Sequence, residues 1–235
     1  MAKLPHASAL AFLASILVSF SALAAQPPYQ PVINAADFVS RVDNPYFPLD
    51  PGTVFRYVTN FKSGQEVNDV VVTHDTKMIL GVMTTVVLDS VYTNGDLTEA
   101  TADWYAQDKT GNVWYFGEDS KELDHGQVVS TEGSWEAGVA GAVPGMVMEA
   151  NPQVGDTYRQ EFQEGVAEDM AKVTGLDVPQ MVPYGSFPCL ETLEWTKLTP
   201  NDRARKYYAR GVGNILELTP KGGQVRSELV SVTRR

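Results

Sequence analysis

Carboxylates beside a tryptophan are the first residues of this chain that could do chemistry. Glu132 and Glu136 flank Trp135, and Glu118 precedes them at the end of an expected strand. A glycoside hydrolase uses such carboxyl groups as an acid and as a base or nucleophile, with an aromatic ring beside the sugar. Because the chain has 29 acidic residues, pairs near aromatic rings also arise by chance. Glycan hydrolysis with these residues therefore stands as one alternative.

Three of the four tryptophans fall in the same section of the chain. Neighbouring antiparallel strands would bring Trp104 close to Trp114. Such a cluster can be hydrophobic core, the wall of a ligand cavity, or both. We expect Trp135 to lie on a loop that covers this cavity. The predicted ligand-binding residues are Trp104, Trp114, Glu118, Glu132, Trp135 and Glu136.

Nucleophilic and metal chemistry have little support in the sequence. Beyond residue 25 the chain has two histidines, His74 and His125, and His125 sits in an expected turn. No glycine-x-serine-x-glycine elbow is present, and zinc would need more histidine or cysteine ligands. Cys189 is the one cysteine, so it forms no internal disulfide and is expected to pack in the core. We assign no catalytic residue and expect no metal and no cofactor.

The elements around these residues show the two-residue alternation of β-strands. Strands are expected at 67–73, 84–92, 99–107, 113–118 and 127–131, with turns such as Asn94-Gly95 between them. Further strands are expected at 157–162, 169–176, 190–198, 206–218 and 226–232. The sequence therefore predicts a mainly β fold, an antiparallel meander that curls into a barrel, a half-barrel or a sandwich.

Two stretches interrupt the strand pattern. Residues 26–51 contain six prolines, which favour an extended lead-in that wraps the surface, with a short helix possible at 34–42. Residues 132–156 are rich in glycine and alanine and are expected to form the longest irregular loop. Residues 52–235 are predicted to form a single β-rich domain.

The amino-terminal segment has the pattern of a secretory signal peptide. Lys3 is followed by an apolar core, and no other charged residue occurs through Ala25. The segment ends in Ala22-Leu23-Ala24-Ala25, small residues of the kind that signal peptidase reads. We expect residues 1–25 to be removed, which places the protein in the periplasm or outside the cell. No stable membrane insertion is expected after cleavage.

The charge of the chain limits its partners. The formal net charge is −11 at pH 7, from 29 acidic and 18 basic residues. Such a surface repels phosphate backbones and anionic membranes, so nucleic-acid binding is not expected. Cations, neutral molecules and basic proteins remain as partners, and the oligomeric state is left open.

Four segments resemble a group of exported bacterial proteins of unknown function. These segments are 103–108 (DWYAQD), 111–118 (GNVWYFGE), 133–138 (GSWEAG) and 206–213 (KYYARGVG). The resemblance covers most of the chain beyond the signal peptide and implies a secreted β domain, without an activity.

Three functional hypotheses follow from these observations. The first is a non-enzymatic binding or carrier domain for a small, partly apolar ligand. The second is a glycan-directed hydrolase that uses the paired carboxylates. The third is a structural or protein-interaction module. An enclosed cavity favours the first, an open cleft with two carboxylates favours the second, and a filled interior favours the third.

Overall fold

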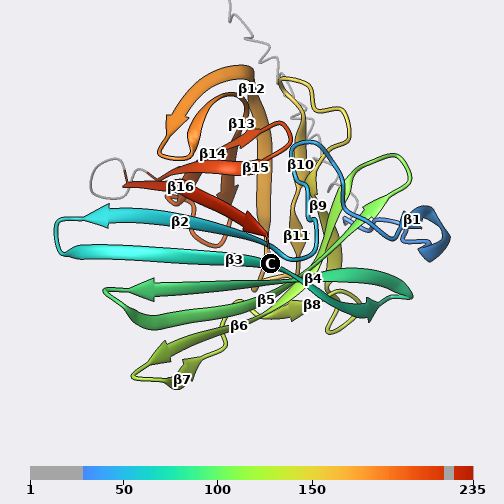
Figure 1. The fold of residues 1–235 in the computed structure, drawn as a ribbon. Helices are drawn as coiled ribbons and strands as arrows, with labels where there is room; N and C mark the ends of the chain where they lie inside the picture. The colour runs from blue at the N-terminus through green and yellow to red at the C-terminus, as the bar shows by residue number, and fades with distance from the viewer. Residues whose placement is uncertain (1–28, 220–224, 235) are drawn as a thin grey trace, which may run out of the picture.

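The computed structural model describes residues 29–219 and 225–234, and antiparallel strands make up most of it (Figure 1). The chain begins with a 3-10 turn, η1 (Ala35–Asp37), and the short β1 (Phe38–Val39). The first long strands are β2 (Thr53–Phe61), β3 (Gly64–Ile79), β4 (Val82–Thr93), β5 (Asp96–Asp108), β6 (Val113–Asp124) and β7 (Gln127–Ser130). There follow β8 (Trp135–Glu136), β9 (Val143–Met148), β10 (Thr157–Arg159), β11 (Glu161–Phe162), β12 (Asp169–Val182), β13 (Gly185–Thr196), β14 (Arg203–Ala209), β15 (Gly213–Thr219) and β16 (Val225–Arg234).

These strands form one curled sheet. Its main path has 13 strands in the order β10-β12-β13-β14-β15-β16-β2-β3-β4-β5-β6-β9-β11. β9 contacts β10, and β11 contacts β12, so the two ends of the path approach each other. The result is a nearly closed, barrel-like sheet, which confirms the predicted mainly β fold and its curled meander.

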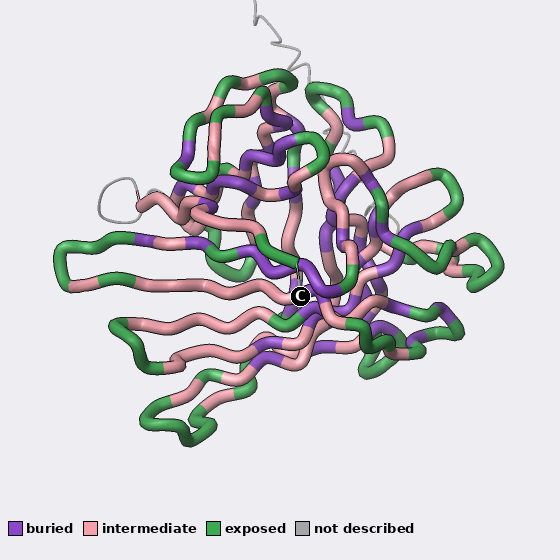
Figure 2. Tube along the Cα trace, viewed as in Figure 1, coloured by how far each residue is buried: buried purple, intermediate pink, exposed green. Residues whose placement is uncertain are grey.

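Short turns account for the long hairpins. Leu80-Gly81, Asn94-Gly95 and His125-Gly126 each place two residues at positive φ, between 49° and 96°. Two central residues at positive φ make the type I′ turn that matches the twist of a hairpin. Figure 2 shows exposed residues at these hairpin tips and buried residues where the strands cross the centre of the molecule.

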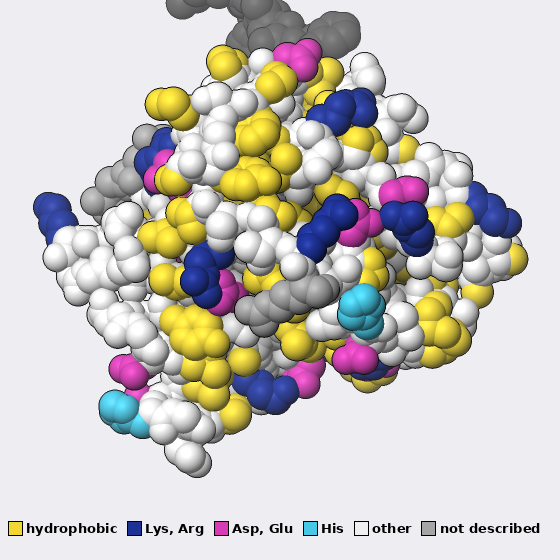
Figure 3. Space-filling model, in the orientation of Figure 1, with side chains coloured by type: hydrophobic (Ala, Val, Ile, Leu, Met, Phe, Trp, Pro, Cys, Tyr) yellow, Lys and Arg dark blue, Asp and Glu magenta, His cyan; other side chains and the backbone are white. Residues whose placement is uncertain are grey.

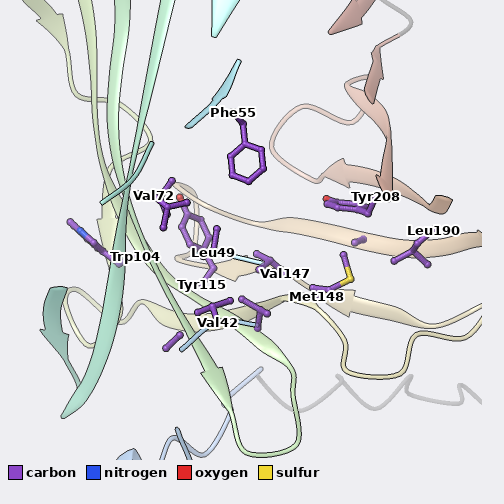
Figure 4. Close-up of a cluster of buried hydrophobic side chains, with 14 of the residues drawn as sticks. Val42, Leu49, Phe55, Val72, Trp104, Tyr115, Val147, Met148, Leu190 and Tyr208 are labelled. Carbon is purple, nitrogen blue, oxygen red and sulfur yellow. The ribbon is translucent and has the colours of Figure 1, made fainter. Parts of the chain in front are cut away.

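The hydrophobic core takes side chains from strands all along the curled sheet, and Figure 4 shows some of them. Trp104 is 6% exposed, and Cys189 is 1% exposed, as expected for a core thiol. The lead-in contributes Val42 and Leu49 to the same core.

The predicted lead-in needs correction in two ways. The possible helix at 34–42 is shortened to η1, which begins at Ala35 and is capped by the Asn34 side chain as predicted, before β1 pairs with β5. The segment also enters the interior instead of only wrapping the surface. The Gln107 side chain accepts hydrogen bonds from the backbone amides of Asp43 and Asn44, which fixes the lead-in against β5.

Two predicted spans also differ from the structure. Residues 132–156 are not one irregular loop, because they contain β8 and β9, both paired with β6. The strand expected at 206–218 is two strands, β14 and β15, joined by a turn with Gly211 at φ 79°. Glycine and alanine obscured the strands of the first span. In the second span, Gly211 and Gly213 lie at positive φ and mark the turn that the predicted single strand did not include.

The predicted signal peptide, residues 1–25, lies outside the described residues. Across 29–219 and 225–234, no helix has the length and apolar character needed to cross a membrane.

Candidate functional site

The interior of the curled sheet carries polar side chains in rows across the strands. One row of cross-strand partners runs over β2 to β6, and its members are Phe55, Val70, Asp89, Thr101 and Ser120. Directly paired residues point to the same face of an antiparallel sheet. Phe55 and Thr101 are only 7% and 6% exposed, so this row faces the interior.

A second row faces the same interior from the other half of the sheet. Its members are Thr192, Lys206, Glu217, Ser227 and Thr59, on β13, β14, β15, β16 and β2. Thr192 and Thr59 are 0% and 3% exposed. Asp89 and Lys206 therefore lie inside one barrel-like sheet, although more than a hundred residues separate them in the sequence.

Lys206 is the central cation of this interior. Its Nζ lies 2.9 Å from a carboxylate oxygen of Glu194 and 4.0 Å from one of Glu217. Glu194 raises the pKa of Lys206 well above its ordinary value, and Glu217 adds to this, although burial acts in the opposite direction. The Tyr208 hydroxyl donates to Glu194 as well, at 3.1 Å. Lys206 is thus charged and already engaged with carboxylates of the protein.

Two cavities meet at Lys206 and Glu217. The larger has a volume of about 510 Å³, and Asp169, Glu194 and Trp195 are among the residues that line it. The smaller has a volume of about 230 Å³. Both open partly to the outside, so a small molecule has access to the Lys206 region.

The smaller cavity has one apolar side and one polar side. Its apolar and aromatic lining is Phe47, Pro48, Leu49, Phe55, Tyr57, Val70, Tyr105, Tyr208 and Val212. Its polar lining includes Asn68, Asp89, Lys206, Asn214, Glu217 and Ser227. Figure 4 shows Phe55 and Tyr208 reaching this region from different strands. The lead-in supplies one wall of the cavity through Phe47, Pro48 and Leu49.

Three oxygens on the polar lining accept no hydrogen bond from the described part of the chain. They are Asn68 Oδ1, Asp89 Oδ1 and Asn214 Oδ1. Asn68 donates its amide to the other oxygen of Asp89, at 3.3 Å. Burial raises the pKa of Asp89 to about 6, and this hydrogen bond offsets part of the shift. Each of these three oxygens has less than 1 Å² of accessible surface, so they lie behind the surface of the cavity.

A second polar cluster lies around Tyr115, whose ring stacks at 4.8 Å on Tyr105 of the smaller cavity. The Tyr115 hydroxyl is within hydrogen-bond distance of Asp103 Oδ1 at 2.5 Å and of Glu118 Oε2 at 3.1 Å. Burial raises the pKa of Glu118 to about 7 and that of Asp103 well above its ordinary value. The tyrosine hydroxyl, and not a cation, is the hydrogen-bonding partner of both carboxyl groups.

Trp135 completes the Tyr115 cluster. It lies opposite Glu118 in the β6–β8 pairing, and its ring meets Tyr115 edge-on at 5.3 Å. Its indole nitrogen donates to Glu161 at 3.1 Å, and burial raises the pKa of Glu161 to about 8. A side chain at Gly117 would collide with the Trp135 carbonyl, so this glycine allows β8 to lie close to β6. Trp135 is 4% exposed and belongs to the core, which does not agree with its predicted place on a covering loop.

The other predicted site residues lie in different surroundings. Lys77 Nζ sits 3.3 Å from the centre of the Trp104 ring and 2.8 Å from Glu136, and the Lys77 and Glu136 side chains are each 35% exposed. Trp114 donates to Asp108 at 2.8 Å. Glu132 is exposed.

The six predicted residues therefore form separate groups. Glu118 and Trp135 come together, Trp104 and Glu136 meet through Lys77, and Trp114 packs beside Phe38 at a ring separation of 6.5 Å. Sequence reasoning missed Asp89, Lys206 and Glu217. All three are charged residues on strands whose side chains face the interior. The sequence alone does not show which face of a strand is the inner one.

Neither the surface charges nor the arrangement of possible metal ligands points to a further site among the described residues. On the face in Figure 3, basic and acidic side chains are interspersed. No group of three or more His, Cys, Asp or Glu within 29–219 and 225–234 has the arrangement of a metal site.

No known protein-family model matches the chain. No curated protein matches it either. Solved structures that resemble it include an inferred exported protein with a YMCC-like fold from Bacteroides fragilis NCTC 9343, at 15% identity and a TM-score of 0.47, covering 80% of this chain and 99% of that chain. Another is an inferred lipoprotein from Parabacteroides distasonis ATCC 8503, at 10% identity and a TM-score of 0.45, covering 80% of this chain and 98% of that chain.

Proposed function

We propose that this protein is an exported, non-enzymatic binding or carrier protein that holds a small, partly apolar molecule inside its curled sheet. The smaller cavity carries this proposal, because it has an aromatic and apolar side facing a polar side. Ligand pockets in proteins combine these two kinds of lining, and the polar groups fix the orientation of the ligand.

The size of the hollow supports a small ligand. The two cavities, of about 230 and 510 Å³, share Lys206 and Glu217. Pockets for small molecules usually measure about 300–1,000 Å³. A molecule with its body in the smaller cavity can thus extend past Lys206 into the larger one.

The position of the carboxylates favours binding over glycan hydrolysis. Glu118 lies in the Tyr115 cluster, Glu136 pairs with Lys77, and Glu132 is exposed. A hydrolase needs two carboxyl groups on either side of one glycosidic bond. None of these three residues lines either of the two cavities at Lys206, which supports binding over hydrolysis there.

The proposed location rests on the sequence. The pattern of Lys3, an apolar core and small residues up to Ala25 is that of an exported protein. A carrier in the periplasm or outside the cell would meet small molecules that have left or have not yet entered the cytoplasm.

Native mass spectrometry of protein recovered from its own host would test the proposal. We expect a bound small molecule that is retained in the gas phase and released on unfolding. Val70→Phe should abolish its retention, because Val70 lines the smaller cavity and the larger ring would fill it. Val58→Phe is the matched control, since Val58 lies on β2 and lines neither of the two cavities. Retention by Val70→Phe equal to that of the control would contradict the proposal.

A further inference from the structure

We infer that the smaller cavity selects an organic cation, a protonated amine attached to an apolar group. This inference rests on the proposed binding function and specifies its ligand. The amine would lie at Asp89, and the apolar group would lie against Phe47, Leu49 and Phe55.

The charges of the lining favour a cation. Asp89 and Glu217 are the carboxylates of the smaller cavity, and Lys206 is its one cation among the described lining residues. Lys206 is engaged by Glu194 at 2.9 Å, so a further carboxylate of the protein already offsets its charge. Asp89 and Glu217 therefore leave the interior with an excess of negative charge.

The carboxylates of the lining favour a ligand that donates hydrogen bonds. Asn68 must direct its amide nitrogen to Asp89, because an ionised carboxylate only accepts, and this leaves Asn68 Oδ1 as an acceptor. A carboxylate that lines a cavity only accepts hydrogen bonds, and an ammonium group brings three donors and no acceptor, so an ammonium group suits Asp89 and Glu217.

The aromatic residues of the cavity add a second, independent preference for a cation. Five of its lining residues are aromatic, namely Phe47, Phe55, Tyr57, Tyr105 and Tyr208. The Phe47 ring lies 5.2 Å from that of Tyr105 and 6.5 Å from that of Tyr208. The faces of such rings attract ammonium groups, and several rings around one site are typical of proteins that bind organic cations.

An anionic ligand would fit the same space poorly. It would need Lys206, whose Nζ is already held between Glu194 and Glu217. It would also lie near Asp89 and add a like charge to a buried carboxylate, which is unfavourable in a low-dielectric interior.

Isothermal titration with three probes of equal chain length tests this inference. The probes are hexylammonium, hexanoate and hexanol, at pH 7.5 and low salt, with the intact exported protein. We expect hexylammonium to bind at least about tenfold more tightly than either other probe, because only the ammonium group can form a charged hydrogen bond with Asp89.

Asp89→Asn should reduce hexylammonium affinity by about tenfold and leave hexanol affinity nearly unchanged. Asp119→Asn is the control, because Asp119 pairs with Lys121 outside the cavity and its side chain is 50% exposed. If Asp89→Asn does not fold, as judged by its thermal transition, Glu217→Gln takes its place with the same expected direction.

Two results would overturn the inference. One is hexanoate or hexanol binding as tightly as hexylammonium, and the other is unchanged hexylammonium affinity in the folded Asp89 or Glu217 variant. Neither would remove the carrier function, which is tested separately by the molecule that the native protein retains. If the wild-type protein from its own host carries no bound small molecule, that result would instead count against the proposed function.

Discussion

The Lys206 region and the Tyr115 cluster lie in the same interior, and they accommodate buried carboxylates in opposite ways. At Lys206, an ammonium group lies 2.9 Å from Glu194 and 4.0 Å from Glu217, and two cavities adjoin it. At Tyr115, a hydroxyl bridges Asp103 and Glu118, and Trp135 packs edge-on against the ring. A cation offsets part of the negative charge in one region, and the carboxyl groups retain their protons in the other.

This difference suggests that one region binds a ligand and that the other stabilises the fold. Ionised carboxylates around an open space can attract a ligand, because their field reaches into that space. Carboxyl groups with raised pKa values inside packed core serve as hydrogen-bonding groups and make folding sensitive to pH. We therefore place the ligand at Lys206 and Asp89, and assign the Tyr115 cluster to stability.

Removing Trp135 should give the largest effect on stability. Trp135→Ala should lower the free energy of unfolding by about 4 kcal/mol, as should Trp104→Ala, because both side chains are nearly fully buried. Urea denaturation of both variants measures this. A loss below about 1 kcal/mol for Trp135→Ala alone would restore the idea that Trp135 covers a cavity, and would undo the assignment of the Tyr115 cluster to packed core.

Removing Lys206 should give the next largest effect. Lys206→Met should lower the free energy of unfolding by about 3 kcal/mol, because it leaves Glu194 buried without its cation. Lys121→Met is the control, since the pair of Lys121 with Asp119 is exposed and should contribute at most about 1 kcal/mol. If the two variants unfold at the same urea concentration, the Lys206 ammonium group does not stabilise the fold. The proposed difference between the Lys206 region and the Tyr115 cluster would then be wrong.

The stability of the protein should also depend on pH, mainly through the Tyr115 cluster. The pKa values of Glu118 and Glu161 rise to about 7 and about 8 in the folded protein. The folded state therefore holds more protons than the unfolded state between the ordinary pKa of a glutamate and these values. The unfolding free energy must then fall as pH rises through this window, so the urea midpoint should be higher at pH 5 than at pH 8.

Glu161→Gln should flatten this pH dependence, because the amide cannot lose a proton. Glu132→Gln, at an exposed carboxylate, should leave it unchanged. A midpoint that rises between pH 5 and pH 8 in the wild-type protein would show that the Tyr115 carboxyl groups are not protonated in the folded state.

The strand pattern could be predicted because it depends on neighbours in the sequence. The strand predicted at 99–107 lies within β5, and the predicted turn at Asn94-Gly95 forms, although the buried residues of β5 fall on both of its faces. Trp104 and Cys189 were also expected in the core, and both are buried. Predictions from local sequence were less accurate where tertiary contacts determine the structure. In residues 34–42, for example, the pairing of β1 with β5 limits the possible helix to η1.

The candidate site could not be predicted because it depends on contacts between distant strands. Asp89, Lys206 and Glu217 lie on β4, β14 and β15, and no local signal shows that they face the same hollow. A charged residue in an alternating strand is usually taken to face solvent. Here several of them face inward, so the closure of the sheet had to be known before the site could be recognised.

A crystal structure of the protein purified from its own host, without unfolding, tests most directly whether the Lys206 region holds a ligand. We expect electron density for an organic molecule in the smaller cavity, within hydrogen-bond distance of Asp89 and in contact with Phe55 or Tyr208. A smaller cavity that contains only ordered water, or a molecule bound in the Tyr115 cluster instead, would contradict the assignment of binding to one region and of stability to the other.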